Sequence, residues 1–230
     1  MGDVSIADAD AIQHALSQVF TDSPRDLKEN SQLKVTLDDN FFYITTPHKF
    51  RLSFRTSHSP SALMRILCMP KAAFHHAPEL EFDINCSTNP PSDTMVQFFS
   101  LLAVAHSLRT DLETLDYIHQ LSLRYDDTRL LPSLTHLELS NYREDLTKTI
   151  EQFLDYRRDA YGTPILSLTC RDLWGANLSN LERFDGLLCS GSFGDKKVHY
   201  VCGSGNPEKL DFTAATIVDV DPAIVSMENQ

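Results

Sequence analysis

The chain has 230 residues, of which 42% are hydrophobic and 23% are charged, so it holds enough apolar material for a packed core and is not expected to be disordered throughout. Its 20 basic and 32 acidic residues give a formal charge of −12, which disfavours nucleic acid and anionic membranes as partners. No apolar run approaches the length of a membrane span, and the opening MGDVSIADAD lacks the basic start and apolar core of a signal peptide.

The elements predicted in chain order alternate between amphipathic helices and short strands. Apolar residues at helical spacing predict a helix over 7–20, and strands follow over 32–37 and 50–56. A helix over 62–69, a strand over 79–84 and a helix over 94–108 come next. The rest of the prediction comprises strands over 119–125 and 135–141, a helix over 144–158 and a strand over 165–170.

Several of the predicted strands share the pattern L-x-x-L-x-L, which is typical of leucine-rich repeats. Leu134-x-x-Leu137-x-Leu139 and Ile118-x-x-Leu121-x-Leu123 fit it, whereas the copies that begin at Ala77 and Thr163 are looser. The steps from Leu52 to Leu80 (28) and from Leu137 to Leu166 (29) suit such repeats, but those from Leu80 to Leu121 (41) and on to Leu137 (16) do not. The sequence therefore predicts an α/β, leucine-rich-repeat-like stack of short parallel strands and helices with irregular repeat length.

The distribution of charges and repeats along the chain predicts three parts. These are an acidic helix and linker over 1–30, the repeat-like domain over 31–207 and an acidic tail over 208–230. Within the domain, leucines and phenylalanines such as Leu123 and Leu166 are expected to point into the core. Their neighbours in each strand would then point to an open sheet face. The candidate partner-binding residues on that face are Arg51, Arg55, Glu81, Asp83, Arg124, His136 and Glu138. The alternative is a solvated sheet face with no partner.

The segments LPSLTHLELSN and EQFLDYRRDAYGTPILSLTC resemble the C-terminal, leucine-rich-repeat-like region of fungal F-box-type proteins. The later segment VHYVCGSGNPEKLDF resembles the closing strand and tail of some of them, so the resemblance covers residues 30–215. Such proteins are similar to substrate receptors of cullin-type ubiquitin ligases. The resemblance implies a module that recognises an unidentified protein target.

An F-box is a helical segment near the N-terminus that opens with a Leu-Pro pair. Only about 30 residues precede the first predicted strand, and Leu131-Pro132 lies among the repeats instead. We therefore expect no F-box here, which puts a cullin-ligase adaptor in doubt as a partner, and no adaptor-binding residue is carried over.

The residues that could support catalysis or a cofactor have simpler structural interpretations. The loop Gly203–Pro207 follows a predicted strand but matches neither GxxxxGK nor GxGxxG, so a tight turn is expected rather than a phosphate loop. His75 and His76 lack the converging ligands of a zinc site. Trp174 is expected to pack in a loop, with a role as an interaction anchor as the alternative.

The cysteines, too, give no sign of a metal site. The chain has five, Cys68, Cys86, Cys170, Cys189 and Cys202, and they form no CxxC pair. They are expected to be reduced, mostly buried thiols in a cytoplasmic or nuclear protein. We therefore expect a non-catalytic protein without cofactor or metal. The alternatives are a small hydrolase-like enzyme with its site at the strand ends, or a truncated paralogue without independent function.

Overall fold

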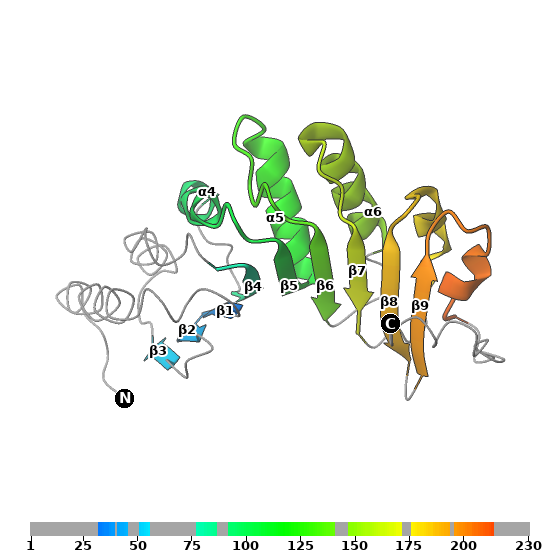
Figure 1. The fold of residues 1–230 in the computed structure, drawn as a ribbon. Helices are drawn as coiled ribbons and strands as arrows, with labels where there is room; N and C mark the ends of the chain where they lie inside the picture. The colour runs from blue at the N-terminus through cyan, green and yellow to red at the C-terminus, as the bar shows by residue number, and fades with distance from the viewer. Residues whose placement is uncertain are drawn as a thin grey trace.

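The computed structural model describes residues 32–39, 41–45, 51–55, 77–86, 92–140, 147–171, 176–193 and 196–213. They form a nine-stranded sheet with the order β3-β2-β1-β4-β5-β6-β7-β8-β9 (Figure 1). The strands are β1 (Gln32–Asp38), β2 (Phe41–Thr45), β3 (Arg51–Arg55), β4 (Glu79–Asn85), β5 (Ser107–Asp111), β6 (His136–Ser140), β7 (Ser167–Cys170), β8 (Leu188–Phe193) and β9 (Lys196–Val201).

Most of the sheet is parallel. Strands β1 and β4 to β8 all pair in parallel, whereas β2 and β3 at one end and β9 at the other pair antiparallel. Parallel neighbours need crossover connections, and helices supply three of them. The α/β class expected from the sequence is confirmed.

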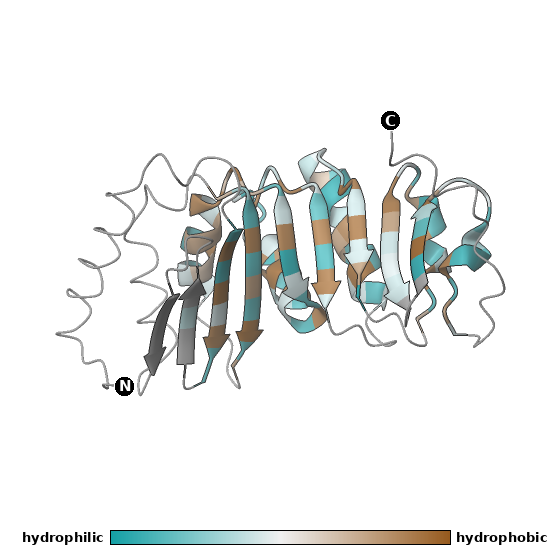
Figure 2. Ribbon diagram, turned by 60° about the horizontal axis from the view of Figure 1, so that its bottom comes forward, coloured by the Kyte–Doolittle hydropathy of each residue, from teal (hydrophilic) through white to brown (hydrophobic). Residues whose placement is uncertain are grey.

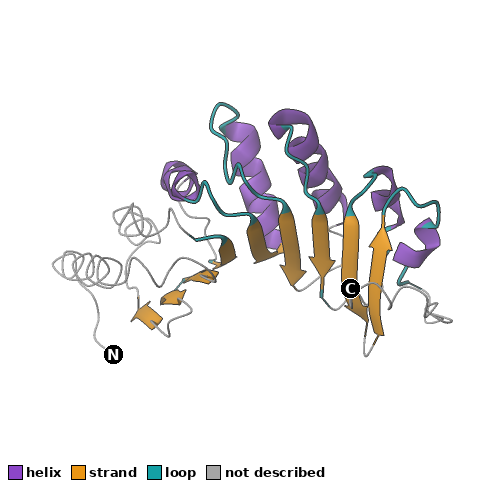
Figure 3. Cartoon of the chain, viewed as in Figure 1, coloured by secondary structure: helices purple, strands orange, loops and turns teal. Residues whose placement is uncertain are grey.

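Three helices cross from one parallel strand to the next, and all of them lie on the same side of the sheet (Figure 3). They are α4 (Ser92–Leu101), α5 (Leu112–Arg124) and α6 (Thr147–Tyr156), and a π-helical turn (Arg157–Tyr161) continues α6. Two short 3₁₀ helices, Ser179–Arg183 and Pro207–Leu210, lie near β8 and β9. None of the helices among the described residues covers the opposite face of the sheet (Figures 1 and 2).

The core lies between the sheet and these helices. Side chains alternate along the strands, so that Leu80, Phe82 and Ile84 of β4 are buried on the helical side. The ring of Phe82 packs against Phe98 and Phe99 of α4, with ring centroids 5.7 and 5.2 Å away. These aromatic contacts anchor α4 over β4.

The strands predicted over 32–37, 50–56, 79–84, 135–141 and 165–170 are present, and β2 is an additional strand. The helix predicted over 94–108 is too long, because α4 ends at Leu101 and residues 107–111 form β5. The strand predicted over 119–125 is wrong, because that segment is the C-terminal half of α5. Leu123 and Leu166, expected in the core, are 50% and 53% exposed.

The pairing of the strands gives a more regular repeat length than the one inferred from sequence. Leu80 pairs with Leu108, Leu108 with Leu137, and Leu137 with Leu168. The steps are therefore 28 (108 − 80), 29 (137 − 108) and 31 (168 − 137) residues. One strand–helix unit of similar length is thus added at each step.

Three other features bear on the sequence predictions. The helices predicted over 7–20 and 62–69 lie outside the described residues. Residues 207–212 span the boundary predicted between domain and tail, and they pack into the core through Leu210 and Phe212. Within the described residues, no helix combines the length and apolar character needed to span a bilayer.

Candidate functional site: a charge ladder on the open sheet face

The face of the sheet opposite the helices carries a row of charged side chains in register. Lys34 of β1 pairs with Glu81 of β4, Glu81 with Arg109 of β5, and Arg109 with Glu138 of β6. The buried neighbours of each of these residues point to the helical side, which leaves this row on the open face. In Figure 2 the same alternation appears as teal and brown bands along the strands.

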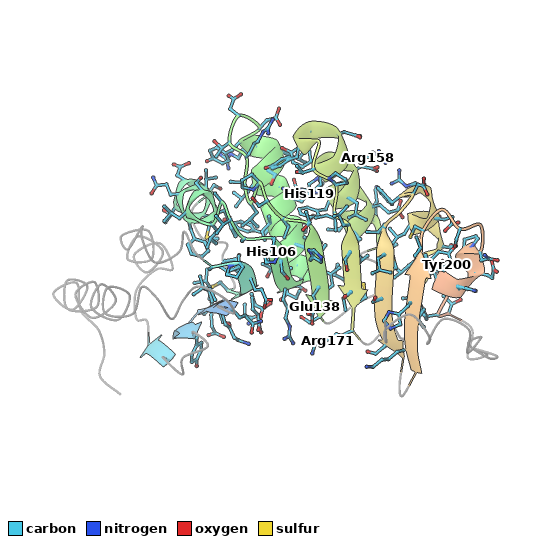
Figure 4. The ribbon with its side chains drawn as sticks, viewed as in Figure 1. His106, His119, Glu138, Arg158, Arg171 and Tyr200 are labelled. Carbon is cyan, nitrogen blue, oxygen red and sulfur yellow. The ribbon has the colours of Figure 1, made fainter. Side chains whose placement is uncertain are left out.

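The charges in this row alternate in sign and contact one another. Lys34 Nζ lies 2.5 Å from Glu81 Oε1, and Arg109 Nη1 lies 3.8 Å from Glu81 Oε2. On the other side of Arg109, its Nε lies 3.5 Å from Glu138 Oε1, which Arg171 Nε also approaches to 2.5 Å. We call these five residues, Lys34, Glu81, Arg109, Glu138 and Arg171, the charge ladder. Glu138 and Arg171 extend away from α5 and α6 in Figure 4.

The two acidic members are more enclosed than the three basic ones. The side chain of Glu81 is 11% exposed and that of Glu138 is 27% exposed, whereas those of Lys34, Arg109 and Arg171 are 31–49% exposed. Ion pairs whose basic partner remains exposed to solvent, as in all of these, each stabilise a fold by only about 0–1 kcal/mol. The ladder is therefore a modest contributor to stability, and its basic groups keep access to solvent and to any partner.

The row continues beyond the ladder as two hydroxyl groups and an imidazole. Glu138 pairs with Thr169 of β7, Thr169 with Ser190 of β8, and Ser190 with His199 of β9. The hydroxyl of Ser190 and Nδ1 of His199 are 3.1 Å apart, within hydrogen-bond distance. Charge is thus concentrated on β1 and β4 to β6 and at the end of β7.

Asp83 lies two residues beyond Glu81 on the same face of β4. Its Oδ1 is buried and has no hydrogen-bond partner, while the backbone N–H of Asp111 donates to the carboxylate. Burial raises the pKa of Asp83 to about 6, and the nearby carboxylates of Asp111 and Glu81 act in the same direction. The open face therefore includes a carboxyl group whose pKa lies well above that of an ordinary aspartate.

Asp83 lies beyond the point at which β4 and β5 stop pairing. Their pairing extends only from Glu79 to Glu81, after which threonine side chains bridge the two segments. Thr110 Oγ1 donates to the carbonyl of Phe82 (2.6 Å), and the N–H of Ile84 donates to Thr114 Oγ1 (2.9 Å). Asp111 then caps α5 by accepting from the N–H of Thr114. The two carboxylates thus lie close enough to repel each other where the strands separate.

Four of the seven residues predicted to form the site lie on this face: Glu81, Asp83, His136 and Glu138. The prediction for Arg124 is wrong, because Arg124 is the last residue of α5, which packs on the opposite side. Arg51 and Arg55 are on β3, and their side chains lie outside the described residues. The backbone register still places Arg51 in the ladder row, through Thr45 and Lys34.

Sequence reasoning missed Lys34, Arg109 and Arg171. Lys34 alternates with buried Leu33 and Val35 in a strand that was predicted, so the alternation could have found it. Arg109 was missed because the helix predicted over 94–108 took in the first two residues of β5, so no strand was predicted at its position. The step of 28 residues from Leu80 would have identified Leu108 as a strand residue and Arg109 as its neighbour on the open face.

The other sequence candidates do not assemble into a catalytic or metal site among the described residues. No group of three or more His, Cys, Asp and Glu side chains there is arranged to hold a metal ion. His119 is buried between α5 and α6, where burial lowers its pKa (Figure 4). His75, His76 and Trp174 lie outside the described residues.

The glycine-containing loop 203–207 binds a carboxylate of this chain. Glu182 accepts a hydrogen bond from the N–H of Gly205 (2.6 Å) and from the hydroxyl of Tyr200 (2.7 Å). Gly203 and Gly205 have φ angles of 86° and 84°, which point their N–H groups toward that carboxylate. The loop is therefore a turn, as the sequence predicts, and its donors hold Glu182.

Comparison with known proteins gives no match: neither a family model, nor a curated protein, nor a solved structure matches the chain.

Proposed function

We propose that the chain is a non-catalytic protein-recognition module that binds a protein partner through the open face of its sheet. The observation that carries the proposal is the charge ladder. A one-sided sheet needs only a solvated polar face, for which scattered threonines and serines suffice. Here five charges of alternating sign are instead aligned across neighbouring strands.

The length and the charges of the ladder indicate what kind of surface would bind to it. Neighbouring strands lie about 4.8 Å apart, so the ladder from β1 to β7 covers roughly 19 Å. Its three basic and two acidic groups suit a surface with interspersed charges of opposite sign rather than a uniformly charged polymer. A folded protein surface or a peptide of mixed charge meets that requirement.

The arrangement of the units supports a finer version of the proposal. Strands β4 to β8 follow one another in chain order, and the helices lie on one side, which is the arrangement of leucine-rich-repeat-like stacks. On the resemblance to F-box-type proteins, the partner would be a target protein held for a ubiquitin ligase. The compartment that we propose is the cytoplasm or the nucleus.

The experiment inverts the ladder without removing its internal pairs. The variant combines Lys34→Glu, Glu81→Lys, Arg109→Glu, Glu138→Arg and Arg171→Glu, so every neighbouring pair keeps opposite signs. The fold should survive, because attraction within the row is preserved, while complementarity to the partner is reversed. Tagged wild-type and inverted chains are used to capture proteins from lysate, which mass spectrometry identifies.

Arg124→Glu is the matched control, because Arg124 is an exposed charge at the end of α5. We expect the wild-type and Arg124→Glu chains to capture the same partner and the inverted chain to lose at least ten-fold, which corresponds to about 1.4 kcal/mol. Equal capture by the inverted chain, with unchanged circular dichroism, would refute the proposal. A cullin adaptor among the captured proteins would support the ligase version.

A further inference from the structure

Two cysteine thiols lie against each other at the end of the sheet. Cys189 of β8 and Cys202, which directly follows β9, have Sγ atoms 3.5 Å apart. Both residues are buried, with 4% and 1% of their surface exposed. They belong to the core between the sheet and the helical side, so this pair is separate from the charge ladder.

The hairpin brings these two thiols together. Cys189 pairs with Tyr200, and Cys202 lies two residues further along, on the same buried side of the hairpin. The N–H of Cys202 donates to the carbonyl of Leu187, and the N–H of Gly186 donates to the carbonyl of Cys202. These bonds fix the two backbones side by side, so the thiol contact belongs to the hydrogen-bonded end of the hairpin.

We propose that Cys189 and Cys202 form a redox-modification site, at which hydrogen peroxide converts the two thiols into an intramolecular disulfide. A disulfide bond is about 2.05 Å long, so the sulfur atoms need to approach by roughly 1.5 Å.

The chemistry balances with peroxide as the oxidant. One thiol loses its proton, and the thiolate sulfur attacks a peroxide oxygen, which breaks the O–O bond and releases water once hydroxide takes up a proton. The second thiol then attacks the resulting sulfenic acid, forms the S–S bond and displaces a second water. Two thiols and one peroxide give one disulfide and two waters.

The neighbouring thiol Cys170 serves as an internal comparison. It is buried on β7, where burial raises its pKa to about 12, and it faces the same small cavity as Cys189. A thiol that is harder to ionise is a poorer nucleophile toward peroxide. In the pair, the thiol of Cys189 is positioned to donate to Cys202, which lowers the pKa of Cys202 and favours its thiolate.

The test treats the native full-length chain with a small molar excess of hydrogen peroxide, then blocks free thiols and maps the peptides by mass spectrometry without reduction. We expect a cross-linked peptide pair containing Cys189 and Cys202, lighter than the two free peptides by two hydrogen atoms. The thermal midpoint of the oxidised chain should rise by about 5–10 °C, because the bond restrains the unfolded hairpin, and a reductant should reverse the shift.

Cys170→Ser and Cys189→Ser are the matched variants. The cross-link and the thermal shift should persist in Cys170→Ser and vanish in Cys189→Ser. Peptides of the wild-type chain in which both thiols stay free, or in which each is oxidised to a sulfinic acid without a cross-link, would overturn the proposal. A cross-link from Cys189 to Cys170 in place of Cys202 would overturn it as well. The peptide map of the wild-type chain decides the question even where a variant folds poorly.

Discussion

Asp83 is the residue on the open face whose environment fits its charge least well. One carboxylate oxygen is buried without a partner, and two other carboxylates, those of Asp111 and Glu81, lie near it. Lys34 offsets only part of this repulsion. The pKa of Asp83 is therefore about 6 in the folded chain, above its ordinary value of 3.8. Between pH 3.8 and about 6 the folded state binds more protons than the unfolded state, so the contribution of Asp83 to stability falls as pH rises through this range.

We expect Asp83→Asn to stabilise the chain at neutral pH. A pKa of about 6 against 3.8 corresponds to about 3 kcal/mol, which solvent screening of this partly exposed group reduces to about 1–2 kcal/mol. The gain should be present at pH 7 and shrink as the pH approaches about 4, where the wild-type carboxyl is protonated. Urea unfolding at several pH values measures it. A variant no more stable than wild type at pH 7 would contradict the account.

Arg157 shows how a single side chain joins several elements. It is 2% exposed, and its guanidinium donates to the carbonyls of Leu130, Leu131 and Leu134 in the loop between α5 and β6. The same group lies 4.3 Å from the ring centroid of Tyr161. Burial lowers its pKa to about 10, so it stays charged at neutral pH. The π-helical turn thereby fixes the loop that leads into β6 and its ladder residue.

Replacing Arg157 should loosen this connection between elements. We expect Arg157→Met to lower the free energy of unfolding by about 3–5 kcal/mol, because the loop carbonyls lose their buried donors. Arg157→Lys should recover little, since an ammonium group cannot span three carbonyls. The neighbouring Arg158 is on the surface, so Arg158→Met is the control and should change little. Denaturant unfolding compares the three variants, and a wild-type midpoint for Arg157→Met would contradict this role.

At the scale of elements, sequence patterns predicted the strands with strong alternation and failed where two periods overlap. The segment HQLSLRY alternates as a strand does, but Leu115, Ile118 and Leu121 also follow helical spacing, and the N-cap at Asp111 favours the helix. Strand β5 is SLRTD, with only one apolar residue. Its first two residues were therefore assigned to the helix predicted from the apolar residues before it. Pairing with β4 and β6 decides its structure, and no local pattern contains that information.

At the scale of the molecule, the sequence predicted the one-sided sheet but not the full row of charges. Glu81, Asp83, His136 and Glu138 followed from alternation within single strands. The contact between Lys34 and Glu81 joins residues 47 positions apart, and it depends on the register of two strands. Register depends on tertiary structure, which explains why the two acidic members of the ladder could be predicted from alternation while its three basic members and their order were not.

The most direct test of the open face is site-specific photo-crosslinking. A benzophenone amino acid replaces Thr169, which continues the ladder row on β7, or Gln120, which is exposed on α5. Each full-length chain is irradiated in lysate, and the cross-linked products are identified by mass spectrometry. We expect a specific partner adduct from position 169 and none from position 120. The same adduct from position 120 alone, or from both positions equally, would contradict recognition through the charge ladder.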